Sequence, residues 1–342
     1  MALPCGGPRV STESIVNKSS PERLIPADLV GVGLNATDTL IRLPHHPALG
    51  SKVEIRSAEI LPGGQVATAV AACQQWGLRT RYVGKVGDDG AASIHRAEFA
   101  SLGVETHLIT AEGCESQQAI ILVDDAGERT VLWKRDHGLT LRPDELRREW
   151  ITDARALHVD GHDTAAAVAA AGWARAAGIP VIADLDDLYP GVEELIGKVD
   201  YLITSRDIPG RLAGKGDLRK SLPAVRSQYG CRLTAATLGQ DGVLAWDGAQ
   251  FHYSAAFRIE PLDTTGAGDI FHAGFIFGLL QGWPVARQLD FACAAAALNC
   301  TAAGARGGIQ SVENIEKLIA TGARHRRAFD DARSLPQNPL EG

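Results

Sequence analysis

The sequence predicts an α/β protein whose mostly parallel central sheet is covered by helices on both faces. Short β-branched runs alternate with helical stretches of about 10–15 residues, which is the order of βαβ units. The 342 residues are enough for one large α/β domain, and a composition of 45% hydrophobic and 22% charged residues can form a substantial core.

The strands of this sheet are expected at six apolar runs: 28–34, 82–86, 156–160, 180–185, 201–204 and 233–239. Helices are expected at 65–77, 164–178 and 266–282. Two segments, 39–62 and 116–135, break the alternation and read as β-hairpins, the second with a turn at 124–128. Hairpins inserted into an α/β body predict a lid over an active site.

The two ends differ in composition from the rest of the chain. Residues 1–26 and 326–342 are predicted to be flexible tails, which leaves one domain at 27–325. The sequence has no signal-peptide run and no apolar stretch of about 20 residues, so we expect a cytoplasmic protein that binds no membrane. Six cysteines without a C-x-x-C pair are typical of reduced, buried thiols.

A net charge of −7 argues against a nucleic-acid partner. It does not exclude a polyphosphate ligand, because local donors bind phosphate whatever the charge of the whole chain.

The run D-T-T-G-A-G-D at 263–269 precedes an apolar helix. Gly266, Ala267 and Gly268 add little side-chain bulk where the loop becomes a helix, so their backbone amides and the helix dipole form an anion site. Asp269 falls in the first helical turn, where a carboxylate can accept a hydroxyl proton as the oxygen attacks phosphorus. Each residue alone fits an ordinary helix start, but the complete string favours phosphoryl transfer.

This string resembles the C-terminal signature of the ribokinase-like (PfkB) carbohydrate kinases. Gly63-Gly64 before a helix, YVGKVGDDG at 82–90, a first strand leading to Asp38, and the turn at 237–242 follow in the order of that family. The resemblance covers about residues 28 to 318, and 263–300 is most similar to the ketohexokinase branch.

The resemblance implies a ribokinase-like three-layer α/β/α sandwich with a small β-sheet lid. It also implies an ATP-dependent and Mg²⁺-dependent enzyme that phosphorylates a hydroxyl of a sugar or sugar acid, with a ketohexose such as fructose as one candidate.

By the same resemblance, Asp269 is the base and the amides of Gly266, Ala267 and Gly268 form the anion hole. The implied substrate-binding residues are Asn35, Asp38, Gly63, Gly64, Gln65 and Thr68. The implied phosphate-binding and nucleotide-binding residues are Arg129, Thr237, Gly239, Gly242, Ala297 and Asn299. Arg129 also fits an exposed turn residue, and Ala297 and Asn299 fit an interior helix face equally well. The positions that match a K⁺ site in some relatives are Asp263, Thr265 and Gly304.

The chain departs from the family at two places. Relatives more often carry Asn where Gln65 and Thr68 stand, so the implied sugar does not transfer directly. Many relatives also carry N-x-x-E to place water around Mg²⁺, where this chain has Ser205-Arg206-Asp207-Ile208. Asp207, Asp184 and Asp186 are nearby acids that also read as ordinary surface or loop residues, so the Mg²⁺ ligands stay unassigned.

Three alternatives remain open. A nucleoside or vitamin kinase of the same fold would need a stacking platform, and residues 35–68 contain no aromatic residue, which favours a sugar. A non-catalytic sugar sensor would be free to lose Asp269 and the Gly-Ala-Gly turn. The apolar hairpin residues Ile120, Ile121 and Leu122 fit either a homodimer formed through the lid or a lid that faces its own site.

Overall fold

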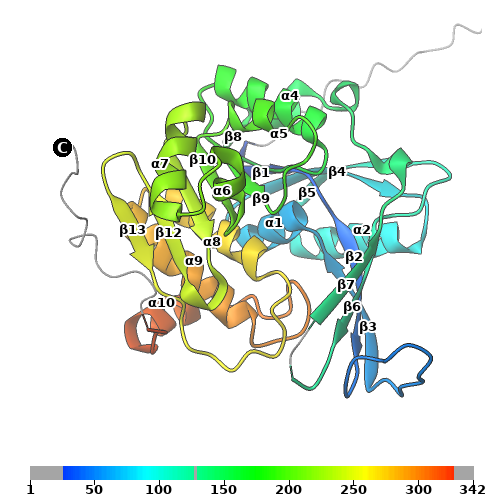
Figure 1. Cartoon of the computed structure of the whole chain (residues 1–342). Helices are drawn as coiled ribbons and strands as arrows, with labels where there is room; N and C mark the ends of the chain where they lie inside the picture. Colours follow the sequence, from blue (N-terminus) through cyan, green and yellow to red (C-terminus); the bar gives the residue numbers. More distant parts are fainter. Residues whose placement is uncertain (1–25, 127–128, 327–342) are drawn as a thin grey trace, which may run out of the picture.

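The computed structural model describes residues 26–126 and 129–326. The tails predicted at 1–26 and 326–342 lie outside these ranges, apart from residues 26 and 326. The described chain forms a nine-stranded sheet between two layers of helices, and a separate four-stranded sheet beside it (Figure 1). The predicted α/β architecture, a mostly parallel central sheet between helices with a small second sheet, is confirmed.

The large sheet has the strand order β13-β12-β11-β10-β9-β8-β1-β4-β5. Seven strands are parallel: β1 (Ala27–Val32), β4 (Thr80–Gly87), β5 (Glu105–Ala111), β8 (Ala154–Asp160), β9 (Val181–Leu185), β10 (Tyr201–Ser205) and β11 (Leu233–Thr237). The antiparallel strands β12 (Val243–Trp246) and β13 (Phe251–Ser254) complete one edge. All six runs predicted as strands lie in this sheet.

Helices cover both faces because successive strand residues point to opposite sides. Leu29 packs into one apolar cluster and Val30 into the other. The first face carries α1 (Gln65–Gln75), α2 (Gly90–Leu102), α8 (Ala267–Leu280), α9 (Val285–Asn299) and α10 (Val312–Thr321). The second carries α3 (Arg148–Thr152), α4 (Thr164–Ala176), α5 (Val192–Ile196), α6 (Ile208–Ala213) and α7 (Leu218–Tyr229). Short 3₁₀ turns occupy His137–Leu139, Pro143–Glu145 and Gly239–Asp241.

The small sheet, called the lid below, consists of β3 (Ser57–Gly63), β2 (Ala36–Arg42), β6 (Gln118–Val123) and β7 (Arg129–Lys134), in that order. It confirms the two predicted hairpins, which a parallel β2–β6 pair joins into one sheet. Asp38 lies inside lid strand β2, opposite Leu61, and not at the end of the first strand as the sequence predicts. The chain leaves the large sheet after Val32, and β2 then pairs with the lid strands.

The two faces of the lid differ. Leu40, Ile121 and Val123 are buried against the body, with Leu61 beside them. The opposite face exposes Ile60, Ile120 and Leu132, which the strand register places in one row across the sheet.

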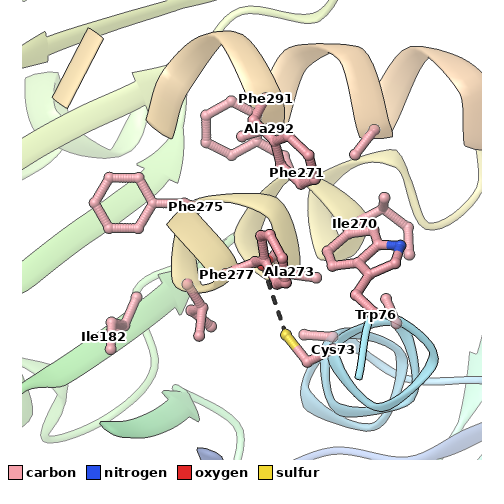
Figure 2. Packing of buried hydrophobic residues seen from close by; sticks show 14 of the residues in the cluster. Cys73, Trp76, Ile182, Ile270, Phe271, Ala273, Phe275, Phe277, Phe291 and Ala292 are labelled. Carbon is pink, nitrogen blue, oxygen red and sulfur yellow. Dashed lines mark hydrogen bonds between the residues drawn. The ribbon is translucent and has the colours of Figure 1, made fainter. Parts of the chain in front are cut away.

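Helix α8 is fixed on almost every side, which makes its first turn a rigid platform. Figure 2 shows it between α1 and α9, with Phe271, Phe275 and Phe277 among the packed side chains. The Cys73 thiol on α1 donates to the carbonyl oxygen of Ala273 at 3.6 Å. None of the helices in the described ranges has both the length and the apolar character needed to cross a bilayer.

Candidate active site

The N-terminus of α8 opens into a cavity of about 430 Å³, which Ala267 and Gly268 help to line. Gly266 caps the helix with a φ of 76°, and a Cβ there would lie 2.3 Å from the carbonyl oxygen of Ala305. Only glycine fits this corner. A Cβ on Gly268 would meet no heavy atom within 4 Å, so this side of the first turn is open.

Two of the three amides predicted to form an anion hole are available to a ligand. Among the described residues, nothing accepts a hydrogen bond from the amides of Gly266 and Gly268. The amide of Ala267 is not open as predicted, because it donates to the carbonyl oxygen of Thr264 at 3.3 Å. The two open amides and the dipole of a 14-residue helix favour a phosphate group here.

Asp269 lies half-buried in the first turn of α8, and no described residue donates a hydrogen bond to its carboxylate. Burial, followed by the negative charge of Asp184, raises the pKa of Asp269 to about 7. The charge of Asp38 acts in the same direction, whereas His272 and Arg306 oppose it. A carboxylate with a pKa near neutrality can both take a proton from a hydroxyl and release it afterwards.

A buried carboxylate–histidine pair lies behind this base. Nδ1 of His272, on α8, is 3.3 Å from Oδ2 of Asp184, on β9, and 2.8 Å from the carbonyl oxygen of Gly268. Nε2 lies 3.4 Å from the carbonyl oxygen of Ile203, so the shorter contact to Gly268 favours the proton on Nδ1, since a carbonyl oxygen only accepts. The pair fixes the turn that holds Asp269.

Asp38 is the second carboxylate of the site. It is 6% exposed and accepts no hydrogen bond from the described residues, and burial raises its pKa to about 6. A Cβ on Gly63 would lie 2.2 Å from Oδ2 of Asp38. Gly64, with a φ of 94°, approaches the Cα of Asn35 so closely that a Cβ would be 2.4 Å away. The glycine pair therefore makes room for a carboxylate whose acceptor positions are unfilled.

The side chain of Asn35 is held in one orientation. Its Nδ2 donates to the Tyr82 hydroxyl at 2.9 Å and to the Lys85 carbonyl oxygen at 3.1 Å. The carbonyl can only accept, so the amide cannot be reversed. Oδ1 of Asn35 is buried without a partner and needs a donor such as a ligand hydroxyl.

Two glutamines add further unfilled acceptors, since Oε1 of Gln65 and Oε1 of Gln117 are both buried without a partner. No sequence motif marks Gln117, which precedes β6. The prediction for Thr68 is corrected. Thr68 is fully buried and its hydroxyl accepts from Nε of Arg306 at 3.1 Å, so it supports an arginine beneath the site.

Four of the residues predicted to bind nucleotide lie together, because Thr237, Gly239, Gly242 and Ala297 all line the 430 Å³ cavity. The remaining walls are largely apolar and include Phe257, Ile259, Phe271, Ala296 and Cys300. Its volume and apolar walls suit a flat base. The segment around Phe257 carries no motif, so the sequence analysis missed it.

Asn299 does not line this cavity, and its predicted place in an adenine wall is corrected. It is fully buried, and its Nδ2 donates to the carbonyl oxygens of Thr265 at 3.3 Å and Ala305 at 3.0 Å. Its Oδ1 accepts from the amide of Gly308 at 3.3 Å. Asn299 thus joins the loop before α8 to the loop after α9.

Arg129 is exposed at the start of lid strand β7. Burial raises the pKa of the Cys300 thiol to about 11, and the positive charge of Arg129 acts against that rise. The two side chains are therefore close enough to interact electrostatically.

The three residues matched to a monovalent cation are adjacent. Oδ1 of Asp263 accepts from the amide of Thr265 at 2.9 Å, and Oδ2 accepts from the amide of Gly304 at 2.8 Å. The carboxylate is thus used to join two loops, while Oγ1 of Thr265 is buried and unpartnered. That orphaned oxygen fits a cation ligand.

The other acids considered for Mg²⁺ have partners in the protein. Asp207 pairs with Arg211 at 3.2 Å, and Asp186 accepts from the Tyr189 hydroxyl at 2.9 Å. Within 26–126 and 129–326, no three His, Cys, Asp or Glu side chains form a group that could hold a metal ion.

Comparison with known proteins gives a consistent result. A model of the pfkB family of carbohydrate kinases matches residues 28–311. An ATP-dependent ribose-1-phosphate kinase of Halopiger xanaduensis is 30% identical over 79% of this chain and 90% of its own length. A ribokinase of Bacillus subtilis is 26% identical over 84% of this chain and 98% of its own.

Solved structures share the fold. A provisionally assigned ribokinase from Agrobacterium tumefaciens superposes with a TM-score of 0.80 at 28% identity, over 86% of this chain and 97% of its own. A ribokinase of Arabidopsis thaliana, solved with ribose and ATP, has a TM-score of 0.75 at 22% identity, over 87% of this chain and 100% of its own.

Proposed function

The chain belongs to the pfkB family of carbohydrate kinases and is an ATP-dependent kinase, and we propose that Asp269 is the base of its phosphoryl transfer. The proposed reaction moves the γ-phosphoryl group of ATP to a hydroxyl of a sugar or sugar acid. The observation that carries it is the unpaired Asp269 carboxylate beside two open amides at the start of α8.

The proposed step balances as follows. The acceptor hydroxyl gives its proton to Asp269 while its oxygen forms a bond to the γ-phosphorus, and the bond from that phosphorus to the bridging oxygen of ADP breaks. The amides of Gly266 and Gly268 face the charge that gathers on the moving group. One preorganised donor of this kind contributes about 2.7–4 kcal/mol to such a step. We propose that Mg²⁺ arrives with ATP and is held by its phosphates and by water.

The acceptor side supports a polyhydroxyl ligand. The unfilled atoms of Asp38, Asn35, Gln65 and Gln117 are all hydrogen-bond acceptors, which complement the O–H donors of a sugar. Tyr82 is fully buried and offers no open face on which a nucleoside base could stack. Both observations favour a carbohydrate over a nucleoside.

A coupled ATP-consumption and thermal-shift screen tests this function. The panel contains fructose and other ketohexoses, ribose, ribose 1-phosphate, 2-keto-3-deoxy sugar acids and nucleosides. We expect turnover with a sugar, a sugar phosphate or a sugar acid. Turnover confined to nucleosides would favour the alternative acceptor, and stabilisation without turnover would favour a sensor.

We propose a monovalent cation site at the carbonyl oxygens of Asp263, Thr265 and Gly304, beside the anion hole. A bound K⁺ would stabilise the loop that presents the open amides. The kcat in K⁺ should therefore exceed the kcat in Na⁺ or Tris buffer at equal ionic strength. Equal rates in the three buffers would remove this site from the account.

We also propose that the protein dimerises through the outer face of the lid. Ile60, Ile120 and Leu132 are 61%, 42% and 54% exposed and form one row, while Ile121 faces its own body. Such a row is unfavourable in water unless another surface covers it. Sedimentation should give about twice the 36.2 kDa chain mass, and Leu132→Lys should shift the protein toward monomer.

A further inference from the structure

The loop after α9 places an arginine beneath the acceptor site. The side chain of Arg306 is 6% exposed and ends among three partners. Its Nε donates to the Thr68 hydroxyl at 3.1 Å, its Nη2 donates to the Gly63 carbonyl oxygen at 2.8 Å, and its Nη1 pairs with Glu98.

These partners come from three different elements that surround the acceptor. Gly63 ends lid strand β3, Thr68 lies on α1 and Glu98 lies on α2. A Cβ on Gly63 would also overlap the Asp38 carboxylate. One guanidinium therefore fixes the point where the lid joins the body, through a fork of donors that a lysine cannot reproduce.

Arg306 also interacts electrostatically with several carboxylates of the site. Its charge lowers the pKa of Asp38 and of Asp269, in both cases against a larger rise caused by burial. Glu98 is its ion-pair partner. The neighbouring histidine, His95, does not share this role, because burial lowers its pKa to about 3 and leaves it neutral.

Other ionisable groups also face these carboxylates. Asp184 and His272 act on Asp269, and Asp263 acts on Asp38. The Tyr82 hydroxyl lies close enough to interact with Arg306. Of the cations in this set, Arg306 is the one that acts on both Asp38 and Asp269.

We propose that Arg306 is a positioning residue for the phosphoryl transfer. It holds the Gly63 carbonyl and the Thr68 hydroxyl where the acceptor floor needs them. Its guanidinium also places a positive charge beside the Gly63 floor that Asp38 contacts, where it favours the ionised form of the neighbouring carboxylates. The inference rests on the function proposed above.

The geometric half of the proposal is tested with Arg306→Lys, which keeps the charge and loses the fork. With D-ribose or D-fructose as acceptor, whichever turns over faster, the KM for the sugar should rise at least about tenfold through lost charged hydrogen bonds. The KM for ATP should change by less than about twofold, because the nucleotide cavity does not include Arg306. A sugar KM equal to that of the wild type would overturn this half.

The charge half is tested without turnover, by ¹³C NMR titration of the aspartate carboxyl groups in the ligand-free protein. The double variant Glu98→Gln/Arg306→Gln removes the ion pair, and the Asp38 and Asp269 titrations should move to higher pH. Glu98→Gln alone leaves the cation uncompensated, so the same titrations should move to lower pH. The exposed Glu112→Gln serves as the matched control and should leave both titrations in place.

If the double variant fails to fold, Glu98→Gln alone still tests the charge role, because it should move the Asp38 and Asp269 titrations to lower pH. Titrations that stay unchanged in Glu98→Gln, or that move to higher pH, would overturn the charge role. Because the titration needs no substrate, a failure of the kinase proposal would be seen separately, as absent ATP consumption by the wild type.

Discussion

Replacing Asp269 by Asn should lower kcat at least about 100-fold while ATP still binds, because about 100-fold is the low end for a positioned base. The Asn side chain has the size of the Asp carboxylate but cannot take the proton of the acceptor hydroxyl. ATP affinity should be retained, since the cavity walls and the amides of Gly266 and Gly268 are untouched. Steady-state kinetics with calorimetric ATP titration provide the measurement.

This variant should also remain folded. The native protein raises the pKa of Asp269 from 3.8 to about 7, so ionisation of Asp269 reduces stability as pH rises between these values. At pH 8 that cost is fully present, and Asn removes it, so Tm should not fall. Asp144→Asn, on an exposed carboxylate that does not line the cavity, is the matched control. Near-normal kcat in Asp269→Asn would mean that another group takes the proton.

Replacing Asp38 by Asn should lower kcat/KM for the sugar at least about 100-fold. No described residue donates a hydrogen bond to Asp38, so its two oxygens can accept from two ligand hydroxyls, and hydrogen bonds to a charged group contribute about 1.5–3 kcal/mol each. Loss of about 2.7 kcal/mol is already 100-fold. The loss should appear in the KM and kcat/KM measured for the sugar, whereas the KM for ATP should be nearly unchanged.

The matched control for Asp38 is Glu59→Gln, which changes an exposed acid on the neighbouring lid strand β3. It should behave as the wild type. If Asp38→Asn raised the KM for ATP as much as the KM for the sugar, Asp38 would not belong to an acceptor site.

Local pattern accounts for much of the fold. The buried parallel strands were predictable because each is a short run of apolar residues, and α8 because its apolar residues follow a glycine-rich turn. The lid hairpins were predictable because residues 39–62 and 116–135 break the alternation of strands and helices. Strand β2 was not fully predictable, since nothing in the run around Asn35 shows that the chain leaves one sheet and enters another.

The site divides in the same way. Asp269 and the glycines of its turn are close in sequence, so their pattern is visible. Arg306 is not, because its contacts to Thr68 and Glu98 span 238 and 208 residues and arise only when the chain has folded. Asn299 shows the converse error, since a polar residue on a helix beside the cavity turned inward to join two loops.

The most direct test of the proposed base is the pH dependence of kcat/KM for the sugar in the wild type and in Asp269→Asn. The base must be ionised to act, so the wild-type value should fall as pH drops through about 7, and Asp38 should add a second fall near 6. In Asp269→Asn the residual rate should keep only the lower of these two falls. A fall near pH 7 that persists unchanged in Asp269→Asn would contradict the assignment of Asp269 as the base.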